Sequence, residues 1–153
     1  MYWKNNFFWI VGLVTFVLDQ LTKYLVVKTF NLKETFAIIP GVFHFTYVTN
    51  TGAAFSLFSG SVESLRWLSL IVSLALMAMA IWGPRLNFWE KLGYGCILGG
   101  AMGNGIDRFI LGYVVDFLDF RLINFPVFNL ADVFINIGII SLLISAFSQT
   151  PNK

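Results

Sequence analysis

Residues 99–135, GGAMGNGIDRFILGYVVDFLDFRLINFPVFNLADVFI, decide the fold of this chain. The stretch sets polar side chains in an otherwise apolar sequence: Asn104, Asp107, Arg108, Asp116, Asp119, Arg121, Asn129 and Asp132. An ionisable side chain at membrane depth costs about 2.5–3.5 kcal/mol on insertion scales, so such residues are kept where they have a task. We therefore interpret residues 99–135 as an active site at the boundary of a membrane.

The composition indicates an integral membrane protein. Of 153 residues, 58% are hydrophobic and only 12% are charged, and the mean hydropathy is +0.77, well outside the balance of soluble domains. The net charge is +2 and the basic residues are scattered, unlike the clustered footprint of a nucleic-acid-binding protein. Cys96 is the only cysteine and lies in an apolar run, which favours a buried structural thiol over a nucleophile.

Hydropathy predicts an all-α membrane protein with four transmembrane helices in a single domain, residues 1–153. The helices are expected at residues 7–27, 65–82, 89–109 and 130–147, joined by β-containing loops at 28–62 and 111–128. The first span covers about 31 Å at the helical rise, which matches the hydrocarbon core. We expect it to be retained, because no small-residue cleavage site follows it.

Local patterns add detail to these elements. Asp19 and Lys23 are spaced i, i+4 with the acid first, the better order for an ion pair, and either a structural pair or a substrate contact fits. Gly95, Gly99 and Gly103 form one small-residue face for close helix contact. β-Branched and aromatic residues predict a strand at 42–48 and a short strand or interfacial segment at 113–120, as parts of a small extramembrane β platform. His44, the only histidine, is expected at a strand surface.

Four spans would place both chain ends on one side of the membrane and the polar residues on the other. The set expected to converge there is Asp19, Lys23, Asn50, Asn104, Asp107, Arg108, Asp116, Asn129 and Asp132. Asn129 is a good N-cap for the last helix, which gives Asp132 an ordinary alternative role in the first helical turn. Basic residues divide almost evenly between the two sides, so charge alone does not set the orientation.

Asp116 and Asp132 are the candidates for a catalytic pair, because neither has a cation at helical spacing. Two carboxyl groups held together do not both ionise cheaply, and the pair can share one proton. Such a pair activates water and protonates a leaving amine without a metal or cofactor. A zinc site has little support, since the sequence has neither an HExxH motif nor a cysteine cluster. A proton- or ion-coupled transporter and a purely structural membrane protein remain alternatives at this point.

Five sequence motifs, which we call boxes, occur in an order that resembles one family, the bacterial lipoprotein signal peptidases (signal peptidase II). The boxes are DQLTK from Asp19, NTGAAFS from Asn50, GGAMGNGIDR from Gly99, VVDF from Val114 and FNLAD from Phe128. They cover nearly the whole chain, and five ordered boxes are far more specific than one.

The resemblance implies an aspartic endopeptidase of the bacterial inner membrane, with a cytoplasmic N-terminus and its site toward the periplasm. It implies cleavage of prolipoproteins before a cysteine that carries diacylglycerol, contact with membrane lipid, and sensitivity to globomycin-type inhibitors. In family terms Asp116 and Asp132 match the catalytic dyad. The positions that match site-supporting residues are Asp19, Lys23, Asn50, Gly52, Asn104, Asp107, Arg108, Asn129 and Ala131.

Overall fold

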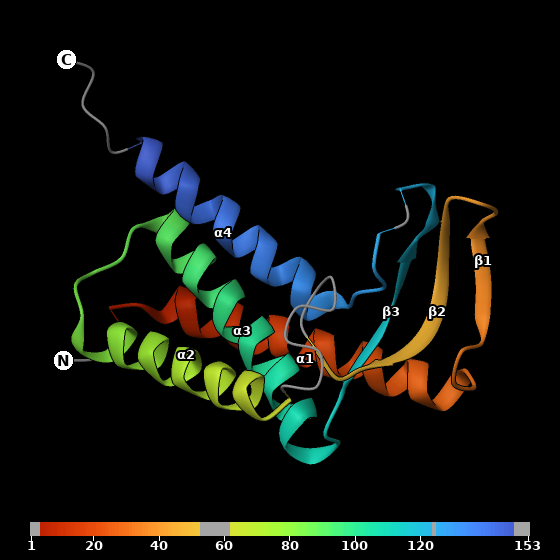
Figure 1. Cartoon of the computed structure of the whole chain (residues 1–153). Coiled ribbons are helices and arrows are strands. Elements are labelled where there is room, and N and C mark those ends of the chain that lie inside the picture. The colour runs from red at the N-terminus through yellow and green to blue at the C-terminus, as the bar shows by residue number, and fades with distance from the viewer. Residues whose placement is uncertain (1–3, 53–61, 124, 149–153) are drawn as a thin grey trace.

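The computed structural model describes residues 4–52, 62–123 and 125–148, in which four α-helices carry a three-stranded sheet at one end (Figure 1). The helices are α1 (Asn6–Thr29), α2 (Val62–Trp82), α3 (Phe88–Ile110) and α4 (Leu130–Ser148). Each contains its predicted span and extends it by at most three residues at an end. The predicted fold class, a helical membrane protein with a small β platform, is confirmed.

The central helix is α3, which packs against each of the other three helices. Its glycines are the reason that the backbones approach so closely. A Cβ atom at Gly99 would lie 2.7 Å from the backbone oxygen of Gly12 on α1, and one at Gly100 would lie 2.5 Å from that of Ala131 on α4. Small residues on several faces therefore let α3 carry polar groups into the middle of the bundle.

Three of the described helices, α1, α2 and α4, are long and apolar enough to cross a membrane. Their outward side chains are large and exposed, as at Leu13 on α1 and Ile71 on α2, which fits contact with lipid. Among the described helices, α3 does not meet the same criterion of length and apolar composition. Its neighbours enclose it, so glycine and polar residues replace the apolar surface that a lipid-facing helix needs.

The sheet consists of β1 (Thr35–Ile39), β2 (Phe43–Asn50) and β3 (Val114–Phe120), antiparallel in the order β1-β2-β3. A bulge interrupts the register of β2 and β3 between Phe45 and Val48. Val26 of α1 packs with Tyr47, Val115 and Phe117, which fixes the sheet to the end of the bundle. In Figure 1 the strands run across the direction of the helices, at the end opposite the beginning of α1.

Two details differ from the sequence-based expectations. The structure contains β1, which we did not predict as a strand, and its five residues are all exposed, so no alternation marks it. His44 was expected at the surface, and that prediction was wrong. Its side chain is buried, with Nδ1 3.3 Å from Thr35 Oγ1 and Nε2 accepting from the Gly41 backbone at 3.3 Å.

Candidate active site

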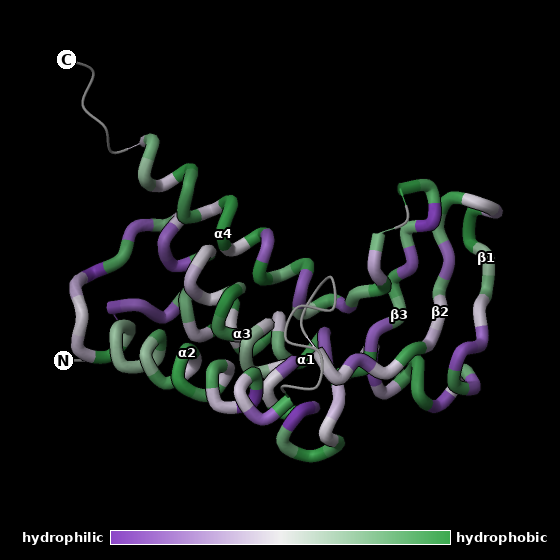
Figure 2. The backbone as a smooth tube through the Cα atoms, in the orientation of Figure 1, coloured by the Kyte–Doolittle hydropathy of each residue, from purple (hydrophilic) through white to green (hydrophobic). Residues whose placement is uncertain are grey.

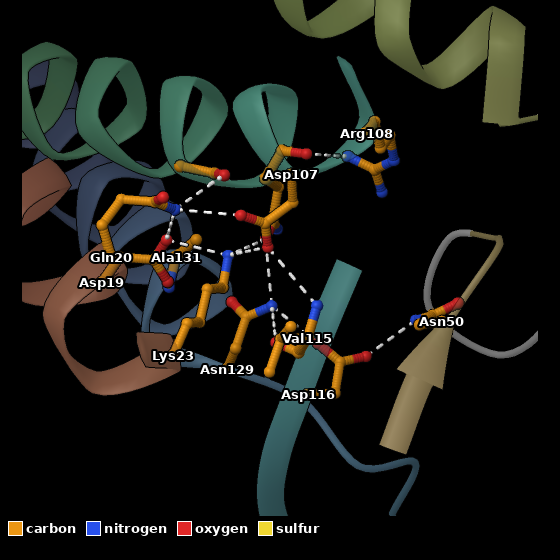
Figure 3. A network of polar contacts seen from close by, with 12 residues as sticks. Asp19, Gln20, Lys23, Asn50, Asp107, Arg108, Val115, Asp116, Asn129 and Ala131 are labelled. Carbon is orange, nitrogen blue, oxygen red and sulfur yellow. Dashed lines mark hydrogen bonds and ion pairs between the residues drawn. The ribbon is translucent and has the colours of Figure 1, made fainter. Parts of the chain in front are cut away.

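The strand β3 holds the carboxyl group of Asp116 at the junction of sheet and bundle (Figure 3). Its side chain is 1% exposed. Oδ1 accepts a hydrogen bond from Asn129 Nδ2 at 2.6 Å, and Oδ2 accepts one from Asn50 Nδ2 at 2.9 Å. Asn50 is the last residue of β2 and Asn129 precedes α4, so three separate segments fix one carboxyl group.

Asp132 lies in the first turn of α4. Its backbone N–H donates to Asn129 Oδ1 at 3.1 Å, and its Oδ2 accepts from the Asn129 backbone at 3.2 Å. This reciprocal arrangement is a capping box, and it confirms Asn129 as the N-cap. The other oxygen, Oδ1, accepts from Asn104 Nδ2 of α3 at 2.9 Å. The cap therefore orients Asp132 and leaves it bonded to a second helix.

Two asparagines connect the two carboxyl groups. Asn129 Nδ2 is 2.6 Å from Asp116 Oδ1 and 2.9 Å from Asn104 Oδ1, while Asn104 Nδ2 donates to Asp132. The result is a continuous chain of contacts from Asp116 through Asn129 and Asn104 to Asp132. Each amide both donates and accepts, so this amide bridge connects the two acids through neutral groups.

A buried ion cluster lies behind the amide bridge. Lys23 Nζ is 2.8 Å from Asp19 Oδ2, 2.9 Å from Asp107 Oδ2 and 2.9 Å from Asn104 Oδ1. Asp19 is fully buried and Lys23 is 3% exposed. The predicted Asp19–Lys23 pair is thus confirmed, and its burial favours the structural role over contact with substrate.

The same cluster fixes the backbone of the elements that carry the acids. Asp19 Oδ1 accepts from the Ala131 backbone N–H at 2.9 Å, and Asp107 Oδ2 accepts from that of Val115 at 3.3 Å. Gln20 Nε2 is 3.1 Å from Asp107 Oδ1 and 3.2 Å from Asp19 Oδ2. Because Ala131 and Val115 directly precede Asp132 and Asp116 in the chain, movement in the ion cluster would displace both acids.

Arg108 closes the site at the last turn of α3. Its Nη2 donates to the Gly52 backbone oxygen at 3.2 Å and its Nη1 to that of Asn104 at 3.3 Å, as expected for a residue that cannot face its neighbour Asp107 on the helix. Its buried Nε has no hydrogen-bond partner within the described part of the chain. Arg66 of α2 in turn donates to the Arg108 backbone oxygen at 2.9 Å.

A cavity of about 720 Å³ opens in front of these groups. Its polar wall is formed by Asn50, Gly52, Asn104, Arg108, Asp116 and Asp132. Its apolar wall comes from α4 and the segment before it, including Phe128, Val133, Ile137 and Ile140. A smaller groove of about 270 Å³ between α2, α3 and α4 shares Asn104, Arg108 and Asp132. One compartment therefore combines a pair of acids with a surface suited to an apolar chain.

The electrostatics favour one shared proton. Burial, and then the negative charge of Asp132, raise the pKa of Asp116 to about 7, although Asn50, Asn129 and Lys23 oppose the shift. Asp119 on the same strand behaves differently. Burial opposes ionisation there too, but hydrogen bonds from Thr46 and Arg121 hold the pKa of Asp119 below its usual value. A carboxyl group that titrates near neutrality beside another acid is equipped for general acid and base catalysis.

The structure brings together every residue that the sequence assigned to the site. Eleven residues belong to this assembly: Asp19, Lys23, Asn50, Gly52, Asn104, Asp107, Arg108, Asp116, Asn129, Ala131 and Asp132. The rest of the NTGAAFS box, from Ala53 to Ser56, lies outside the described residues. Sequence reasoning missed Gln20 as an individual residue, and it missed Arg66, whose partner is distant in the sequence.

Comparison with known proteins gives consistent matches along the chain. A family model described as signal peptidase (SPase) II matches residues 11–148. The lipoprotein signal peptidase of Nostoc punctiforme is 68% identical over 150 residues, which cover 98% of this chain and 95% of that protein. The protein of the same name from Microcystis aeruginosa is 70% identical over 148 residues, 96% of each chain.

Solved structures agree with the sequence comparisons. A bacterial membrane enzyme determined at 2.3 Å resolution is 32% identical and superposes with a TM-score of 0.85, covering 94% of this chain and 89% of that one. A second, at 1.9 Å, is 31% identical with a TM-score of 0.80 and covers 92% of both chains. The similarity therefore extends over both the helical bundle and the β platform.

Proposed function

Because this chain belongs to the signal peptidase II family, we propose that Asp116 and Asp132 are the two acids with which it cleaves lipoprotein signal peptides. Membership of the family makes it an aspartic protease that removes these peptides. The assignment to particular residues is supported by one observation above all. Hydrogen bonds join Asp116 to Asp132 through Asn129 and Asn104, and both acids are among the residues that line the cavity.

The proposed reaction uses one ionised and one protonated carboxyl group. The ionised acid takes a proton from a water molecule as the water oxygen attacks the scissile carbonyl carbon. The protonated acid donates to the carbonyl oxygen as its double bond opens. In the collapse that follows, the acid that took the water proton gives it to the amine nitrogen as the C–N bond breaks, and the other acid recovers a proton from a hydroxyl group of the intermediate, so the pair returns to its starting state.

The surroundings suggest which acid begins in which state. Asp132 lies in the first turn of α4 and accepts from the Asn129 backbone, where the helix macrodipole favours a negative charge. Asp116 lies in a strand and has no such dipole, and its pKa is raised to about 7 by burial and by the charge of Asp132. We therefore propose Asp132 as the base toward water and Asp116 as the first proton donor.

The proposed substrate is a prolipoprotein whose cysteine, directly after the cleaved bond, carries diacylglycerol. The cavity supports this choice because its polar wall bears the acids and its apolar wall includes Val133, Ile137 and Ile140 of α4. Acyl chains would lie along that apolar wall while the peptide crosses the carboxyl groups. Cyclic peptide inhibitors of the globomycin type would compete for the same cavity.

The proposed location is the bacterial inner membrane, crossed by all four helices, with the cavity toward the periplasm and the N-terminus in the cytoplasm.

We propose that the remaining site residues position the two acids and their neighbours. Lys23, Asp19 and Asp107 hold Asn104, Ala131 and Val115, and Arg108 fixes the Gly52 backbone.

The test uses purified protein in lipid nanodiscs with two forms of one prolipoprotein, with and without diacylglycerol on the cysteine. We expect cleavage of the lipidated form only, with a new N-terminus at the modified cysteine. Equal cleavage of both forms would refute the lipid requirement but leave the acids in place. Asp-dependent ion flux without cleavage would instead support the transporter alternative.

A further inference from the structure

The outer end of the β platform carries apolar side chains that the other described elements leave partly or largely exposed. Phe120 ends β3, and Leu122 and Ile123 belong to the short 3₁₀ helix η2 (Arg121–Ile123) that follows. Leu122 and Ile123 are each 67% exposed and Phe120 is 39% exposed. We call Phe120, Leu122 and Ile123 the tip patch. Burying apolar side chains of this size is favourable, so their joint exposure to water would be costly.

The charged residue within this segment is turned away from the tip patch. Arg121 Nε donates to Asp119 Oδ2 at 2.8 Å, and its Nη2 donates to Thr35 Oγ1 at 2.9 Å. Thr46 Oγ1 also donates to Asp119 Oδ2, at 2.6 Å. These contacts hold the guanidinium on the side of the sheet that carries Asp119, Thr35 and Thr46. The neighbouring tip patch is thereby left uncharged, which suits an apolar surrounding.

The arrangement of the elements indicates what that surrounding is. The strands run across the helix direction, so the far ends of β2 and β3 project sideways past the bundle (Figure 1). Figure 2 shows hydrophobic colour at the end of β3 and along the helices. The chain then returns from the tip patch toward the start of α4. A surface that projects sideways at the boundary of membrane-spanning helices lies over lipid.

From this continuity with the lipid-facing helices we propose that the tip patch rests in the headgroup and acyl boundary of the same bilayer. Interfacial segments bury their apolar side chains about 5–10 Å into this region. Asp116 is on the same strand as Phe120, so this contact would fix the height of the proposed site relative to the lipid. The platform is then held at two ends, by Val26 of α1 and by lipid.

The first test measures contact with lipid without using catalysis. In a Cys96→Ala background, Leu122→Cys and, as a control at the polar end of the platform, Asn31→Cys carry the same fluorophore in nanodiscs. Lipid with a spin label near the headgroup should quench the probe at 122 about twofold more than the probe at 31, and aqueous iodide should do the reverse. A probe at 122 that iodide quenches as strongly as at 31 would overturn the proposal. A probe protected from both quenchers would also overturn it, in favour of a protein partner such as a second copy.

The second test removes the apolar character and keeps the Arg121–Asp119 pair. Leu122→Gln with Ile123→Gln should lower prolipoprotein cleavage in nanodiscs about tenfold and change it less than about twofold in detergent, where no flat interface exists. Phe147→Gln, an exposed apolar residue at the far end of α4, is the matched control and should have no effect in either. Equal loss in nanodiscs and detergent would overturn the role in membrane positioning.

Discussion

Asn129 Nδ2 lies 2.6 Å from Asp116 Oδ1, while the Asn129 Oδ1 atom accepts from the Asp132 backbone at 3.1 Å. One side chain therefore begins α4 and also binds the acid on β3. The helix cap and the proposed active site share an amide group, so a substitution at Asn129 tests both functions at once.

Serine and alanine at position 129 should separate these two functions. Serine caps a helix about as well as asparagine, whereas alanine costs roughly 1 kcal/mol more. Neither can reach Asp116 as an amide does. We expect Asn129→Ser and Asn129→Ala to lose cleavage to a similar extent, at least about tenfold, because Asp116 becomes ionised once it has donated its proton and a hydrogen bond to a charged group is worth about 1.5–3 kcal/mol. Thermal unfolding should rank the serine variant as the more stable. Full activity in the serine variant would show that the bridge to Asp116 is unnecessary.

The proposed acids should be distinguishable from a third aspartate on the same strand. Asp116→Asn and Asp132→Asn should each reduce cleavage by about 10²–10⁴-fold, the range of general acid and base catalysis. Asp119→Asn is the matched control, because Asp119 is bound by Thr46 and Arg121 outside the cavity lining. It should keep at least about half of the activity, on the premise that proton transfer by the pair carries the reaction. The measurement is the initial cleavage rate of lipidated substrate. A comparable loss in all three variants would indicate a general effect of charge.

Much of the fold could be predicted because the relevant signals are local. Apolar runs of about twenty residues marked the helices, and the N-cap at Asn129 followed from a residue type at a helix start. β1 escaped prediction because all five of its residues are exposed, so neither alternation nor a buried run distinguishes it. His44 was misplaced for a related reason. Its burial depends on the Gly41 turn and on Thr35 of the neighbouring strand.

The sequence predicted which residues belong to the site, but it did not predict which of them contact one another. Asp116 stood out because no cation lies at helical spacing from it, whereas Asp119 forms an ion pair with Arg121 at 2.8 Å in the structure. The contacts of Gln20 with Asp107 and of Arg66 with the Arg108 backbone are made across helices. No periodicity encodes such pairs. The amide bridge likewise depends on how α3, β3 and α4 meet, which only tertiary packing decides.

We expect the buried ion cluster to contribute mainly to the free energy of unfolding, because its residues support the acids without being proposed to transfer protons. Asp19→Ala removes one of two carboxylates from Lys23 and leaves the Ala131 N–H without its acceptor. Breaking a buried pair costs about 3–5 kcal/mol, and the remaining Asp107 should keep the loss near the lower limit. Glu63→Ala is the control, since its ion pair with Arg66 is largely exposed and worth about 1 kcal/mol or less. The comparison uses the unfolding midpoint in one detergent. Equal midpoints for the two variants would contradict the structural role of Asp19.

Stability and cleavage should both depend on pH through Asp116, because burial and the charge of Asp132 raise the pKa of its carboxyl group from 3.8 to about 7. Because the folded protein holds this proton more tightly than the unfolded chain, the stabilisation is complete below about pH 4 and is lost as pH rises through about 7. Cleavage should fall over the same upper range, since both acids are then ionised and the proton donor is absent.

The groups that act on the titration of Asp116 are Asp132 and Lys23 by charge, with Asn50 and Asn129 by hydrogen bonding. Unfolding midpoints from pH 4.5 to 8.5 should decline for the natural sequence and decline less for Asp116→Asn, whose amide does not titrate. Asp119→Asn should keep the decline, because the lowered pKa of Asp119 places its own titration below this range. A decline of equal slope in the natural protein and in Asp116→Asn would mean that another group carries the proton.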